Sequence, residues 1–152
     1  MSQAARRYYE RGLTAIKNTE YQVAVEQLQA AVDLSPGFGS ARIAFAVALA
    51  KFGDCPRAAG VLRAGIGRAT SPTTAAAMLA TLGDVLTLGG DFFGAEEAFR
   101  QAATHPDFAV RAAAGLARVY AKLGRWRDSF SHLALSAGVA APPADGSSGP
   151  RR

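Results

Sequence analysis

Residues 24–31, AVEQLQAA, decide the fold because the same arrangement returns three times, as AAGVLRAG at 58–65, AEEAFRQA at 95–102 and SFSHLALS at 129–136. Each copy begins with a small residue, places a bulky residue four positions later, and ends with a small residue three positions after that. Spacings of three and four residues put side chains on one face of an α-helix. The copies begin 34, 37 and 34 residues apart, which predicts a helical repeat.

A second helix is expected before each copy, because small residues recur there at a matching phase. These residues are Gly12, Ala46, Gly83 and Ala117. Turn-forming residues divide the chain into eight segments of about one helix each. Asp54, Ser71 and Asp91 stand where a side-chain oxygen can accept the free amides of a helix start. No segment alternates polar and apolar residues with period two, so the fold class is all-α. A plain antiparallel bundle would explain the amphipathic helices but not the fixed phase.

The pattern resembles the tetratricopeptide repeat, a 34-residue helix–turn–helix unit, over nearly the whole chain. The turn followed by an aromatic residue occurs at Glu20-Tyr21, Gly90-Asp91-Phe92 and Gly124-Arg125-Trp126, and Pro36 closes a unit. The resemblance implies a right-handed α-solenoid of four repeats and eight helices. The repeat domain is expected to span residues 5–138, with repeats at about 5–38, 39–72, 76–109 and 110–138.

Two segments outside the expected helices can also be described from the sequence. The enlarged spacing between the second and third copies predicts a longer turn around residues 67–72. Residues 139–152 are rich in Pro, Gly and Ser and are expected to form a disordered tail, because they carry too little apolar surface to offset the entropy of ordering.

Composition narrows the class of protein further. No signal peptide and no apolar run long enough to span a membrane is recognisable, so a cytoplasmic protein without membrane insertion is expected. The richness in Ala, Arg and Gly hints at a bacterial source. The formal charge of +5 comes from scattered basic residues, whereas a nucleic-acid partner would require clustered Lys and Arg with interleaved aromatic residues.

No arrangement of residues predicts an enzyme, a cofactor or a metal site. The two histidines, His105 and His132, have no Cys, His or carboxylate neighbour at metal-ligand spacing on their own helices. The adjacent Glu96 and Glu97 point in different directions around a helix. Cys55 has no nearby histidine in sequence and is expected to be inert.

In tetratricopeptide arrays the first helix of each unit lines the concave groove that binds ligands, and the resemblance assigns residues to it by phase. The expected partner-binding residues are Arg6, Tyr9, Leu13, Lys17, Ile43, Val47, Lys51, Asp84, Leu88, Arg111, Arg118 and Lys122, with Ala80 and Ala114 beside them. The positions that form a carboxylate clamp in one subset of the family hold Tyr9, Leu13, Ala44, Ala77 and Thr81. The clamp is therefore expected to be absent.

The leading functional prediction is a protein-interaction adaptor or scaffold. Its groove would bind a protein or peptide segment with apolar anchors and some acidic residues. One alternative is a self-assembling structural component, because the last helix carries Phe130, Leu133 and Leu135 and no further helix follows to cover them. Another is a small secretion-type chaperone, which rests on the analogy of fold alone.

Overall fold

The computed structural model describes residues 2–136 and 138, apart from the side chains of residues 126, 127, 129 and 130. Over this part of the chain it contains eight α-helices, one short 3₁₀ helix and no strand. The elements are α1 (Gln3–Lys17), α2 (Tyr21–Leu34), α3 (Gly39–Phe52), α4 (Cys55–Arg68), α5 (Pro72–Gly89), α6 (Phe92–Ala103), η1 (Pro106–Phe108), α7 (Ala109–Lys122) and α8 (Trp126–Ser136). The expected tail at 139–152 lies outside the described residues.

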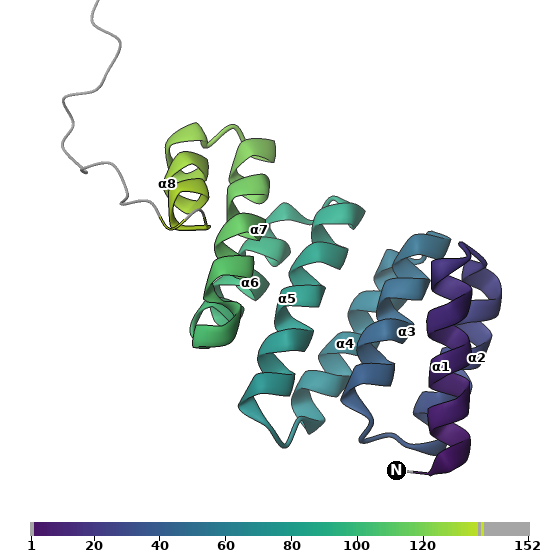
Figure 1. Ribbon diagram of the computed structural model, residues 1–152. Helices are drawn as coiled ribbons and strands as arrows, with labels where there is room; N and C mark the ends of the chain where they lie inside the picture. The colour runs from purple at the N-terminus through teal and green to yellow at the C-terminus, as the bar shows by residue number, and fades with distance from the viewer. Residues whose placement is uncertain (1, 137, 139–152) are drawn as a thin grey trace, which may run out of the picture.

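The helices form four consecutive antiparallel pairs that stack from α1–α2 at one end to α7–α8 at the other (Figure 1). Each of α1, α3 and α5 contacts the next odd-numbered helix, whereas no even-numbered helix in the described part contacts the next even-numbered one. The odd-numbered helices are therefore closer together and lie on the inner side of the curved array. The predicted all-α solenoid is confirmed.

The core consists of contacts between bulky residues of even-numbered helices and small residues of odd-numbered ones. Leu28 and Phe99 are completely buried. Leu28 packs against Gly12, and a Cβ atom added to Gly83 would lie 2.6 Å from Cε1 of Phe99. Phe99 also packs against Gly115 of the following pair. The small positions of the odd-numbered helices thus receive the bulky positions of the even-numbered ones, because the absence of a side chain lets these helices approach closely.

Helix starts use the caps that the sequence predicts. The carboxylates of Asp54 and Asp91 accept hydrogen bonds from the amides of Arg57 (3.2 Å) and Gly94 (3.0 Å), and Ser71 Oγ accepts one from Thr74 (3.5 Å). Side-chain caps of this kind satisfy amides that have no partner within the helix.

The turn inside the first pair differs from the other three. In the later pairs a glycine with positive φ ends the first helix, whereas Thr19 occupies this region in the first pair with φ 61°. A β-branched residue is strained there. Thr19→Gly is therefore expected to raise the free energy of unfolding by about 1 kcal/mol, measured by urea denaturation. Unchanged or lower stability would show that the turn holds threonine without strain.

The longer turn expected around residues 67–72 is wrong. Helix α4 continues to Arg68, only residues 69–71 connect it to α5, and α5 has 18 residues where α3 and α7 have 14 each. The additional residues lengthen α5 at its N-terminus. Ser71 caps this helix, Pro72 occupies its first position, and the alanines that follow favour helix.

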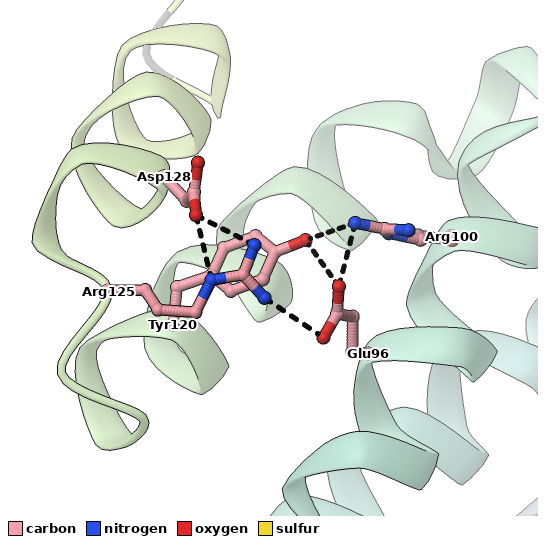
Figure 2. Close-up of polar contacts among 5 residues, drawn as sticks. All are labelled: Glu96, Arg100, Tyr120, Arg125 and Asp128. Atoms are coloured by element: carbon pink, nitrogen blue, oxygen red, sulfur yellow. Dashed lines mark hydrogen bonds and ion pairs between the residues drawn. The ribbon is translucent and has the colours of Figure 1, made fainter.

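Helix α8 is connected to the preceding helices by a polar network centred on the carboxylate of Glu96 (Figure 2). This carboxylate accepts a hydrogen bond from the Tyr120 hydroxyl (2.9 Å) and pairs with Arg100 (2.7 Å) and Arg125 (3.5 Å). Arg125 also pairs with Asp128 (2.8 Å) and lies over the Tyr120 ring. Residues of α6, α7 and the start of α8 thus share one network.

His132 of α8 is a partly buried titratable group at this end of the array. Its ring lies 5.3 Å from that of Tyr120, and its buried Nδ1 has no hydrogen-bond partner within the described residues. Burial lowers the pKa of His132, and the positive charge of Arg100 adds to this effect, whereas Asp128 and Glu96 oppose it. The imidazole of His132 therefore binds its proton more readily in the unfolded chain than in the folded one. Its contribution to the free energy of unfolding is fully present above about pH 6.5 and is lost as the pH falls below that value.

We expect hydrogen exchange of the α8 amides, corrected for its intrinsic pH dependence, to accelerate as the pH falls below about 6.5. His132→Gln should remove this acceleration. The same acceleration in the variant would assign the effect to another group.

Candidate protein-binding groove

A recess of about 600 Å³ lies on the inner side of the array, between α3, α5 and α7. It is named the central recess here. Its lining consists of Val47, Ala50, Lys51, Thr81, Asp84, Val85, Thr87, Leu88, Arg111 and Arg118. Six of the predicted groove residues are therefore brought together: Val47, Lys51, Asp84, Leu88, Arg111 and Arg118.

The polar part of the central recess is centred on one carboxylate. Asp84 Oδ2 accepts a hydrogen bond from Arg111 (2.8 Å), and its Oδ1 accepts one from Arg118 (2.9 Å). Arg111 also donates to Thr81 Oγ1 at 3.5 Å. Lys51 has no hydrogen-bond or ion-pair partner in the described part of the chain. The lining thus contains three cationic side chains and one carboxylate, which leaves the recess with an excess of positive charge.

The apolar part consists mainly of Leu88, Val47 and Val85. Leu88 is 63% exposed, although it belongs to a helix that contacts neighbours on both sides. Val47 is half-buried on α3, and Val85 is a buried part of the lining. An exposed leucine among cationic groups is an arrangement that can accept both an apolar side chain and a carboxylate of another chain.

The remaining predicted groove residues lie elsewhere. Ile43 faces a second recess at the start of α3. On α1, Arg6 pairs with Glu10 (3.2 Å), and the Tyr9 ring packs edge-on against Phe38 at 4.8 Å. Leu13 and Lys17 on α1 and Lys122 at the end of α7 are exposed but do not line the central recess.

The assignment of Ala80 to the groove is wrong, because this residue is completely buried. Helix α5 contacts α3, α4, α6 and α7, so more of its circumference is covered than the phase alone suggests. Conversely, Thr81 and Thr87 line the recess although the phase did not assign them to the partner-binding set. Thr81 stands at one of the carboxylate-clamp positions of the family's groove, and this was the signal from which its presence in the recess could have been predicted.

Comparison with known proteins addresses the fold. No protein-family model matches the sequence, and no curated protein is similar to it. A crystal structure of a thermophilic TPR protein from Thermus thermophilus superposes with a TM-score of 0.67 and 21% identity, over 94% of this chain and 76% of that one. The chain has the tetratricopeptide repeat fold. A structure of MamA MSR-1 C2 is similar at a TM-score of 0.38 and 18% identity, over 88% of this chain and 95% of that one, which is too low to bear on the fold.

Within this tetratricopeptide fold, Asp84 and Arg118 occupy the same position of consecutive repeats, since they are 34 residues apart. Opposite charges at one position of adjacent units form an ion pair when the first helices of the units contact each other, as α5 and α7 do. This spacing is the signal from which the pair could have been predicted.

The described residues contain no group of three or more His, Cys, Asp and Glu side chains that could hold a metal ion, and no helix among them is long and apolar enough to cross a membrane. The largest polar network, around Glu96, connects α6, α7 and α8 of the tetratricopeptide array. Its carboxylate is engaged by two arginines and a tyrosine, which is a structural arrangement.

Proposed function

We propose that this chain is a protein-interaction adaptor that binds a segment of a partner protein in the central recess. The observation that carries the proposal is the combination of an exposed leucine, Leu88, with three cationic side chains in one concave surface. Recesses that bind peptides commonly join apolar anchoring positions to a few charged groups that fix orientation.

The charges indicate the chemistry of the partner segment. The Asp84 carboxylate is already shared by Arg111 and Arg118, so it offers little to a cationic ligand. Lys51 has no partner within the described residues, and each arginine contacts Asp84 through a single terminal nitrogen. A segment with an apolar anchor against Leu88 and acidic residues beside Lys51 and Arg118 suits this surface best.

Selection of displayed random peptides on the intact chain tests the proposal without knowledge of the natural partner. Peptides that combine apolar residues with Asp or Glu are expected to be enriched. They should compete with one another and lose binding to the Leu88→Asp variant. Enriched peptides that bind this variant as well as the original chain would contradict the central recess as the site.

Charge reversal of Lys51 gives a quantitative prediction for such a peptide. Lys51→Glu should weaken binding by about 1 kcal/mol, or roughly fivefold in Kd, because it replaces an attraction with a repulsion at an exposed site. The effect should decrease at high salt. Lys122→Glu is the matched control, since it makes the same charge change outside the recess. Equal effects of the two variants, measured by isothermal titration, would indicate a long-range effect of net charge.

Self-assembly through α8 is the second candidate, and one observation favours it. Leu133 occupies the repeat position of Leu28, Leu62 and Phe99, which are completely buried, but it is 51% exposed. Leu135 is exposed to the same extent. The Phe130 side chain lies outside the described residues. Sedimentation should show association that increases with concentration and is lost in Leu133→Asp. A monomer at all concentrations would exclude this candidate.

A further inference from the structure

A second recess, of about 560 Å³, opens where the starts of α3 and α5 meet the end of α4, and it is named the end recess here. Its polar lining residues are Ser35, Ser40, Arg42, Arg68, Thr70, Thr73 and Thr74. The lining contains two arginines and no acidic residue. This composition differs from that of the central recess, where a carboxylate balances part of the positive charge.

Arg42 is the most unusual of these residues, because its side chain is charged and only 7% of the residue is exposed. Its terminal nitrogens donate to the backbone carbonyls of Pro36 (3.1 Å) and Val61 (3.4 Å), and no carboxylate pairs with it in the described part of the chain. Gly65 makes room for its side chain. A buried charge without an opposite charge is costly, so Arg42 would be stabilised by an anion.

Arg68 adds a second positive charge to the end recess. It is exposed at the end of α4, lines the same recess and has no ion-pair partner within the described residues. Burial lowers the pKa of Arg42, and the positive charge of Arg68 lowers it further. The two guanidinium groups therefore repel each other across a space that holds no compensating protein carboxylate.

Hydrogen-bond donors surround the same space. Gly39 and Ser40 begin α3, whose first turn has no side-chain cap, so amides of this turn remain available. His105 accepts a hydrogen bond at Nδ1 from the amide of Asp107, so in the neutral ring Nε2 carries the proton and donates to Thr73 Oγ1 at 3.2 Å. The Thr73 hydroxyl hydrogen is then free to donate elsewhere.

We propose that the end recess binds a phosphate group. A phosphate or phosphate monoester carries a charge of about −1.5 to −2 at neutral pH, which matches the two unpaired arginines, whereas a single carboxylate would neutralise only one. Its oxygens can accept hydrogen bonds from guanidinium groups, hydroxyls and the amides of a helix start. The site is separate from the central recess and does not depend on the function proposed for it.

Titration of the intact, isotope-labelled chain with inorganic phosphate, followed by NMR, tests this proposal. Sodium chloride at matched ionic strength provides the reference. The amide signals of Gly39, Ser40 and Thr74 are expected to shift saturably with phosphate only. Shifts that remain linear, or that chloride reproduces, would overturn the proposal. Acetate that binds as tightly as phosphate would overturn the choice of phosphate over a carboxylate.

The variant that tests the site is Arg68→Gln, because Arg68 is exposed and its replacement leaves the core intact. It should weaken phosphate binding about tenfold, the loss of one charge-assisted contact. Arg63→Gln, an exposed arginine of the same helix outside the recess, should bind like the original chain. Equal binding by Arg68→Gln and the original chain would overturn the proposal. O-phosphoserine distinguishes the source: tighter binding than phosphate indicates a monoester ligand, and weaker binding indicates the free anion, and either result supports a phosphate site.

Discussion

Phe99→Ala is expected to lower the free energy of unfolding by about 3–5 kcal/mol. Phe99 is completely buried and packs against Gly83 of its own repeat and Gly115 of the next one. Neither glycine has a side chain that could move into the space left by the ring. The resulting cavity would therefore remain between α5 and α7. It would weaken the contact between the third and fourth repeats as well as the packing within the third.

Phe93→Ala is the matched control, because this phenylalanine belongs to the same helix but is 75% exposed. Its replacement should change stability by less than about 0.5 kcal/mol. Urea denaturation followed by circular dichroism measures both. A loss of less than about 1 kcal/mol in Phe99→Ala would mean that the contact between the third and fourth repeats is not what holds them together.

Leu88→Asp is expected to weaken binding of a selected peptide by about 2 kcal/mol or more, which is roughly thirtyfold in Kd. Leu88 is the most exposed apolar side chain of the central recess, and an aspartate there would remove the anchoring surface and repel acidic residues of the ligand. The helix content should not change, because the side chain contributes little to the core. Phe93→Asp makes the same kind of change on α6 and should leave the affinity unaltered.

The sequence was sufficient to predict the helices, their pairing and much of the core. The reason is that equivalent positions of different repeats make equivalent contacts. Gly12 packs against Leu28 in the first repeat as Gly83 packs against Phe99 in the third. The caps at Asp54 and Asp91 were predictable because capping depends on local chemistry alone.

Features that depend on more than one helix were not predictable in the same way. The repeat phase places a residue on one face of a helix but does not say how much of that face the neighbouring helices cover. For this reason the phase did not predict that Ala80 is buried. The three added residues continue α5 because their own helix propensity outweighs the register of the repeat. The burial of Arg42 depends on Gly65 of another helix, a contact that no spacing on α3 reveals.

The groove was predicted as one surface along all four odd-numbered helices, but the structure divides it. Only residues of α3, α5 and α7 line the central recess, whereas those of α1 lie outside it, and Tyr9 of α1 packs against Phe38 instead. In a curved array, equivalent positions on successive odd-numbered helices do not all face the same recess. The periodicity thus predicted candidate residues, and their grouping required the three-dimensional arrangement.

A crystal structure of the intact chain with a selected peptide tests the central claim most directly. The account predicts that the peptide lies between α3, α5 and α7, with an apolar side chain against Leu88 and a carboxylate beside Lys51 or Arg118. A peptide bound along the outer surface of α2, α4 and α6, or against Leu133 on α8, would contradict it.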